Sequence, residues 1–381
     1  MSVTKVTNDN IVDVSAELVS GTLPALDASA VLNMPTGESI TESANDPAID
    51  SDLGLGKLWL NTTNGEMFVC TDATTGENVW KNIAAGDDHV TPPYSFQGTQ
   101  SGWVTAGNAA DNTFETYSLA SNNNAVASGS TLGTVSEGPV ISKSKTDMYV
   151  MGGYVPGALI TDVQKVSFST AAASSTVNNL NSGKYCGGGA SSELRGYQVA
   201  GCDGHDHVEY QSHVNDGDSA DIGNLYQNEA GYATCMSGPT EVLTDIGWYN
   251  LNAVHHFSFA NDATKTKHCD MAGNGYAQGG CSSTTHGYTA SAHQWQTTVR
   301  KVGFASGSTQ INHSTLTVTN QHSSAGCGTC SETHGYQNGG YPTNGNSTTH
   351  HIESWSFASE SGVSHIGNLT QKRAWSVGAQ I

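Results

Sequence analysis

Short stretches in which apolar and polar residues alternate recur along most of the chain, and this pattern predicts β-strands rather than helices. From about residue 97 to the C-terminus the strands recur in six repeats of roughly 45–50 residues, a period typical of β-propellers. The first anchor of each repeat is an aromatic residue: Trp103, Tyr149, Tyr197, Trp248, Tyr288 and Tyr336. The second anchors are Leu119, Phe168, Tyr210, Phe259, Phe304 and Phe357. We therefore expect an all-β fold with a six-bladed propeller over residues 97–381.

Two details of the repeats predict how such a ring would be built. Glycine pairs follow the first anchor at Gly152-Gly153 and Gly339-Gly340, and we expect them to adopt positive φ and to permit close backbone approach near the axis. Residues 374–381 read as a strand that the first repeat otherwise lacks. We expect this strand to complete the first blade and to remove two exposed sheet edges.

Three further zones precede the repeats. Residues 1–40 have no helical period and predict an extended segment that attaches or oligomerises through apolar residues such as Leu23, Leu26, Val31 and Leu32. Residues 41–85 predict a small β-hairpin module, because KLWLN and EMFVC flank an Asn-Gly turn and Trp80 closes a third strand. Its Trp59, Phe68 and Trp80 suit either a small core or a platform for a sugar ring. Residues 86–96, with Pro92-Pro93, predict a hinge.

Charge and composition narrow the classes of partner. The net charge is −20 with only 14 Lys and Arg residues, which disfavours nucleic acid and anionic membrane surfaces. No apolar run is long enough to insert into a membrane. The first residues lack the pattern of a signal peptide, so we expect synthesis in a cytoplasm and eight cysteines that stay thiols.

Three motifs resemble proteins of tailed bacteriophages, especially marine ones. GTLPALDASAVLNMP, within residues 1–40, resembles a tag of tail-fibre proteins, and LWLNTTNGEMFVCTD resembles a small module of phage tail proteins. The GYxxGG, FSFAS and IGNLTQKR pattern is similar to kelch-like propellers at fibre ends, and it is weakest in the third repeat, where QSHVND replaces FSFAS. The resemblance implies a virion tail-fibre protein that binds a host cell-surface glycan or outer-membrane protein. It also implies contacts with other tail proteins and a homotrimer formed through the N-terminal segment.

Candidate binding residues lie in the loops that depart most from the repeat, at 202–218, 240–250 and 321–335. For receptor binding we single out Asp203, His205, His207, Asp216, Asp218, Tyr249, His322 and His334. His205 and His207 share one face of a strand and Cys327 and Cys330 form a CxxC pair, so each pair suits either a bound metal ion or a structural role. No other cofactor is expected.

Catalysis is not predicted. The chain has no GxSxG, HExxH or repeated sialidase box. We therefore predict a binding protein, not an enzyme. Two alternatives stay open: a glycan-degrading enzyme, which needs a carboxylate pair at a site, and a purely structural virion component.

Overall fold

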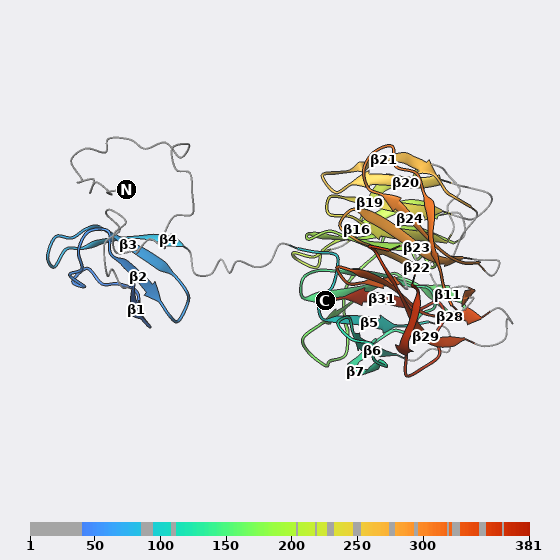
Figure 1. Cartoon of the computed structure of the whole chain (residues 1–381), viewed down its shortest axis with the longest axis horizontal. Helices are drawn as coiled ribbons and strands as arrows, with labels where there is room; N and C mark the ends of the chain where they lie inside the picture. Colours follow the sequence, from blue (N-terminus) through green and yellow to red (C-terminus); the bar gives the residue numbers. More distant parts are fainter. Residues whose placement is uncertain are drawn as a thin grey trace, which may run out of the picture. The chain divides into compact units, whose positions relative to one another are not determined.

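The structure is a computed structural model in which all regular secondary structure of the described residues is β-strand (Figure 1). It describes residues 40–84, 94–107, 112–202, 205–217, 219–226, 232–246, 253–273, 279–292, 296–317, 320–321, 328–342, 348–359 and 362–381. The chain divides between Pro92 and Pro93 into two compact units. No helix in the described part could cross a membrane. The expected attachment residues Leu23, Leu26, Val31 and Leu32 lie outside the described residues.

The first unit is one four-stranded sheet. Its strands, in spatial order, are β1 (Thr41–Ser43), β2 (Leu58–Asn61), β3 (Met67–Asp72) and β4 (Val79–Ala84). The β2–β3 hairpin and the third strand at Trp80 are confirmed, and Gly65 of the turn has a φ of 77°. The sequence analysis missed β1, which is parallel to β2. Trp59 and Trp80 pack edge to face with centroids 5.8 Å apart, and both stay half-buried, so they form part of the core of this sheet.

The second unit contains six antiparallel sheets of similar construction, which we number one to six. Sheet one contains β31 (Val377–Gln380), β5 (Ser101–Thr105), β6 (Thr113–Ser118) and β7 (Val126–Thr131). Sheet two contains β8 (Val140–Lys143), β9 (Asp147–Met151), β12 (Asp162–Ser167) and β13 (Ser175–Asn179). Sheet three contains β14 (Gly188–Ser191), β15 (Arg195–Gly201), β16 (His205–Ser212) and β17 (Ala220–Asn224).

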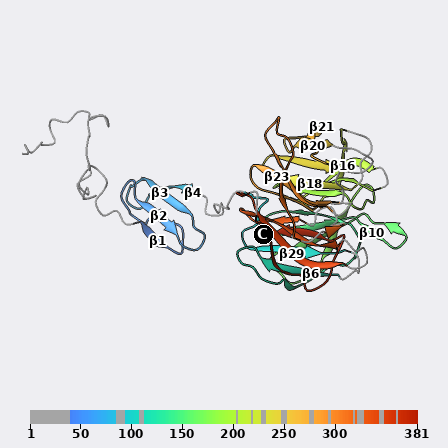
Figure 2. The ribbon, with the colours of Figure 1, turned by 45° about the vertical axis from the view of Figure 1, so that its right-hand side comes forward.

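The other three sheets repeat this order. Sheet four contains β18 (Ala233–Ser237), β19 (Glu241–Ile246), β20 (Ala253–Ser258) and β21 (Asn261–Asp270). Sheet five contains β22 (Gly279–Ser282), β23 (His286–Ala292), β24 (Gln296–Gly303) and β25 (Ile311–Thr315). Sheet six contains β27 (Gly328–Cys330), β28 (His334–Pro342), β29 (Thr349–Ser356) and β30 (Ser364–Asn368), and β28 also pairs with β26 (Asn320–Gln321). A small hairpin, β10 (Tyr154–Val155) with β11 (Ala158–Leu159), joins β9 to β12, and Figure 2 shows β10 at the edge of the second unit.

The C-terminal strand completes sheet one, as predicted. β31 pairs antiparallel with β5, so the last residues of the chain join the first strand of the second unit. The carbonyl of Ile381 accepts hydrogen bonds from the backbone N–H groups of Thr99, Gln100 and Ser101. Both ends of the unit are therefore held in one sheet.

We call the strand named first in each sheet above its first strand: β31, β8, β14, β18, β22 and β27 for sheets one to six. These six first strands lie side by side. β8 lies beside β31 and β14, β18 beside β14 and β22, and β27 beside β22 and β31. Their close approach is permitted by glycines at equivalent positions: a Cβ on Gly189 would lie 2.1 Å from the carbonyl oxygen of Ile141, and one on Gly328 would lie 2.1 Å from that of Gly280. A carbonyl oxygen at that distance excludes any side chain.

The glycine pairs that we expected near the axis have a different neighbourhood. Gly152, Gly153, Gly339 and Gly340 do adopt positive φ. However, a Cβ on Gly152 would meet the carbonyl oxygen of Lys184, and one on Gly339 would meet that of Arg373. Both carbonyls belong to the connections that lead into a first strand. The pairs therefore accommodate these connections, while Gly189 and Gly328 belong to the first strands themselves.

The anchors pack between neighbouring sheets, with two corrections. Trp248 lies outside the described residues, and the strand equivalent to the other anchor strands is β19, where Leu243 is fully buried. In the third repeat the second anchor is His213 rather than Tyr210, because its backbone N–H bonds to Leu194 as that of Phe259 bonds to Thr240. Leu243 stands where the other repeats have tryptophan or tyrosine as the first anchor. His213 stands where most other repeats have phenylalanine as the second anchor. Neither residue was therefore found from the sequence.

Candidate binding cleft

An open cleft lies between sheets three and four, at the end where β14 turns into β15 and β18 turns into β19. Its volume is about 580 Å³, which lies within the range of small-ligand sites. The lining residues come from three turns and the strands beside them: Ser192, Glu193, Leu194, Arg195, Tyr197, Pro239, Thr240, Phe259, Ala260, Asn261 and Asp262.

An ion pair forms the polar part of the cleft. Nη1 of Arg195 donates to Oδ2 of Asp262, and the Tyr197 hydroxyl donates to the same oxygen at 3.1 Å. The guanidinium also lies 4.1 Å from the ring centroid of Tyr210. The Arg195 side chain is 38% exposed while that of Asp262 is 12% exposed, so Arg195 is the partner more accessible to solvent. Burial opposes the charge of Arg195, but the hydrogen bond and the charge of Asp262 outweigh it and raise its pKa.

Apolar surface frames this pair. Phe259 stacks on Tyr197 with centroids 5.7 Å apart and ring planes 20° apart. Leu194, at the tip of the β14–β15 turn, is 59% exposed. An ion pair beside apolar side chains provides a hydrogen-bond donor and an acceptor next to the flat surface of an aromatic ring.

The same arrangement is found between sheets two and three, where it includes one predicted residue. The Tyr149 hydroxyl donates to Oδ1 of Asp216 at 3.0 Å, and Nζ of Lys165 lies 2.9 Å from its Oδ2. Asp216 therefore joins two sheets instead of standing free in a loop. Arg195 occupies the position that Asp147 has in sheet two, so an arginine there is particular to sheet three.

The other predicted site residues are dispersed. His207 lies in β16, with Nδ1 3.0 Å from Oδ1 of Asn224, and His334 begins β28, with Nδ1 2.9 Å from the hydroxyl of Thr333. Burial lowers the pKa of His334. The structure therefore does not bring these two residues together with the cleft. Asp203, Asp218, Tyr249, His322 and Cys327, and the side chain of His205, lie outside the described residues.

Metal binding gains no support from the part of the chain that the structure describes, where no group of three His, Cys, Asp or Glu side chains converges. Cys330 is fully buried in β27 and is a free thiol. His205 and His207 do share strand β16 two residues apart, as expected.

The buried carboxyl group of Asp245 has a raised pKa. Burial raises the pKa of Asp245 to about 6, and its carboxylate accepts hydrogen bonds from Gln310 at 2.8 Å and Thr289 at 3.1 Å. Asp245 is only 1% exposed, so a substrate does not reach it. Its geometry is that of a buried link between sheets four and five.

Sequence reasoning missed the cleft. The only signal was Arg195, which stands two residues before the anchor Tyr197, because none of the other five anchors has an arginine at that place. No model of a known protein family matches this chain, and no curated protein is similar to it in sequence.

Proposed function

We propose that the second unit is a six-bladed β-propeller of a phage tail fibre and that it binds a glycan of the host cell surface. The propeller is supported by six sheets of like topology whose first strands are neighbours, and by the C-terminal strand in sheet one. The viral role rests on the sequence resemblance. In this proposal the first 40 residues attach to other tail proteins and trimerise, and several copies on one virion give avidity.

The observation that carries glycan binding is the cleft between sheets three and four. Sugar hydroxyls both donate and accept hydrogen bonds, so they match the Arg195 guanidinium and the Asp262 carboxylate. The C–H face of a sugar ring is apolar and matches Phe259 and Leu194. The cleft therefore suits a glycan better than a flat protein surface.

Binding of the full chain to purified capsular and outer-membrane polysaccharides tests this function. The double variant Leu194→Ser, Arg195→Gln should abolish saturable binding, because the cleft then loses an apolar side chain and its guanidinium donor. Val126→Ser is the matched control, since Val126 is equally exposed but lies in β7 of sheet one. It should bind as the wild type does.

Other outcomes would favour the alternatives. Release of oligosaccharide during incubation would indicate a glycan-degrading enzyme. Absence of binding to any polysaccharide, together with failure of the chain to block phage adsorption, would favour a structural component of the virion.

A further inference from the structure

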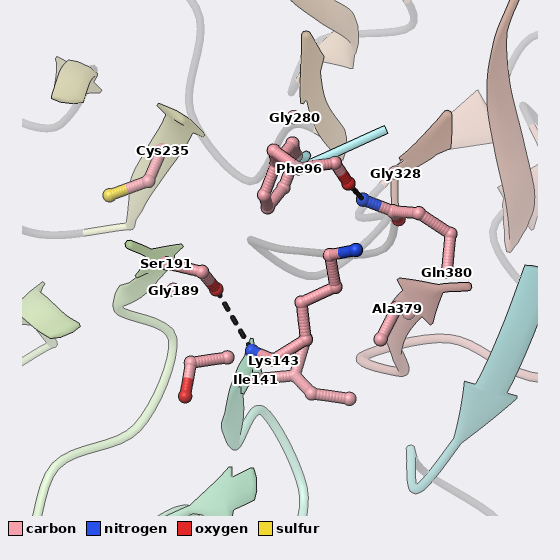
Figure 3. A pocket seen from close by; sticks show the side chains of 12 residues that line it. Phe96, Ile141, Lys143, Gly189, Ser191, Cys235, Gly280, Gly328, Ala379 and Gln380 are labelled. Atoms are coloured by element: carbon pink, nitrogen blue, oxygen red, sulfur yellow. Dashed lines mark hydrogen bonds between the residues drawn. The ribbon is translucent and has the colours of Figure 1, made fainter. Parts of the chain in front are cut away.

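A narrow cavity lies among the first strands of the six sheets. Each of the six sheets contributes at least one residue to the lining, and Phe96 covers part of the cavity (Figure 3). The cavity has room for about one water-sized object. Four of the lining positions are glycines: Gly189, Gly280, Gly328 and Gly378. A Cβ on any of them would lie within 2.7 Å of a neighbouring atom, so the cavity cannot be filled by larger residues.

The side chain of Lys143 extends into this cavity (Figure 3). Lys143 is 5% exposed, and its Nζ lies 5.5 Å from the ring centroid of Tyr94. Lys184, the other buried lysine of the second unit, has its Nζ 2.9 Å from Oε1 of Glu209. Lys143 forms no such ion pair with a carboxylate among the described residues.

Residues 94–98 cover one end of the cavity. The Tyr94 hydroxyl donates to the carbonyl of Lys143 at 3.3 Å, and Nε2 of Gln380 donates to the carbonyl of Phe96 at 2.5 Å. Nε2 of Gln97 donates to Ser282 at 2.9 Å, and the backbone N–H of Gly98 donates to Cys330 at 2.9 Å. This segment therefore bonds to first strands of four different sheets and limits the access of bulk water to Lys143.

The acidic groups near Lys143 do not neutralise it. Burial raises the pKa of the Cys330 thiol to about 12 and raises the pKa of the Tyr94 hydroxyl, so both are uncharged at neutral pH. Burial lowers the pKa of Lys143 to about 8, which leaves most of its ammonium charged at pH 7. The Tyr94 ring faces this ammonium but carries no net charge, and no carboxylate of the described residues pairs with it. A largely buried cation without an opposite charge is unfavourable, which favours a bound counter-ion.

We propose that this cavity binds one small monovalent anion, a halide such as chloride, at Nζ of Lys143. The anion supplies the counter-charge that the described residues do not provide here. The size of the cavity excludes larger anions such as gluconate. Binding joins residues 94–98 and the first strands around a common charge, and it therefore stabilises the second unit.

Thermal unfolding of the full chain tests the site. At pH 7 and constant ionic strength, replacing sodium gluconate by sodium chloride or bromide should raise Tm saturably, by about 3–5 °C if the anion is well above its Kd. Lys143→Met should lose this halide effect. Lys165→Met, in which a lysine paired with Asp216 is removed, should keep it. Equal Tm values of the wild type in gluconate and halide would overturn the proposal.

A second measurement does not depend on any variant. Crystals of the wild-type chain grown in bromide should give an anomalous peak beside Nζ of Lys143. An empty cavity in those crystals would reject the halide site even if Tm responded to salt, because the response would then arise elsewhere on the surface.

Discussion

The imidazole of His213 stacks on the phenol ring of Tyr149, with centroids 4.8 Å apart and ring planes 19° apart. Phe259 stacks on Tyr197 in the same way, and Phe357 on Tyr288. In each pair the tyrosine belongs to one sheet, and the histidine or phenylalanine that stacks on it belongs to the sheet that follows in the chain. A titratable ring thus occupies a position that elsewhere holds phenylalanine.

His213 should make the stability of the second unit depend on pH. Burial lowers the pKa of His213 to about 4, whereas the unfolded chain titrates near 6.5. Between these values the unfolded state binds a proton that the native state does not, so stability falls as pH decreases from 6.5 to 4. His213→Phe should lose less stability than the wild type between pH 7 and pH 5, by about 1–2 kcal/mol.

Denaturant unfolding at both pH values measures this difference. His365→Gln, a change at an exposed histidine, is the control and should follow the wild type. Some pH dependence should remain in His213→Phe, because burial also lowers the pKa of His255 to about 4. Parallel pH profiles of His213→Phe and the wild type would contradict the prediction.

Arg373 and Glu115 should be strongly coupled in stability. Nε of Arg373 donates to Oε1 of Glu115 at 2.8 Å, and both side chains are almost completely buried. Arg373→Met leaves the carboxylate without its cation and should cost about 3–5 kcal/mol in unfolding free energy. Adding Glu115→Gln should recover part of this loss, and a double-mutant cycle by denaturant unfolding measures the coupling. Additive effects would show that the pair does not act as a unit.

An exposed pair provides the comparison. Nζ of Lys267 lies 2.6 Å from Oδ1 of Asp270, but the two side chains are 39% and 77% exposed. Lys267→Met should therefore change stability far less than Arg373→Met does, as measured by the same denaturant unfolding.

Glycines of the first strands should not tolerate alanine. Gly328→Ala places a Cβ 2.1 Å from the carbonyl oxygen of Gly280, and relief requires a backbone shift. We expect a loss of about 1–3 kcal/mol or more, measured as a lower denaturation midpoint. Gly133→Ala is the control, because its Cβ would meet only side-chain atoms at 3.5 and 3.6 Å. Equal stability of both variants would refute the packing argument.

Removal of residues 377–381 should expose strand edges in sheet one. Without β31, the pairing edge of β5 is unprotected, and β8 and β27 lose a neighbour. Unpaired edges promote association, so the truncated chain should elute as aggregates in size-exclusion chromatography. A monodisperse truncated chain that melts as the wild type does would show that β31 is dispensable.

Several elements were accessible from the sequence because each depends on local pattern. The Asn64-Gly65 turn fixed the β2–β3 hairpin, and alternation located β5, β9 and β15 around their anchors. Trp248 was wrong as an anchor because an aromatic residue was sought where β19 uses Leu243. The cleft was missed because Arg195 and Asp262 are 67 residues apart and meet only when two sheets pack.

The sequence by itself determined that this chain forms short antiparallel strands in repeats, since strand alternation and turn residues act over a few positions. It also determined that the C-terminal strand must join the first repeat, because one strand was missing there. Only the tertiary structure decided which polar side chains are paired and which are not. The partner of Lys184 is Glu209 and the partner of Arg195 is Asp262, whereas Lys143 extends into a cavity that no carboxylate of the described part of the chain lines. Such pairing depends on how sheets pack, and packing joins residues whose separation along the chain has no periodic signature.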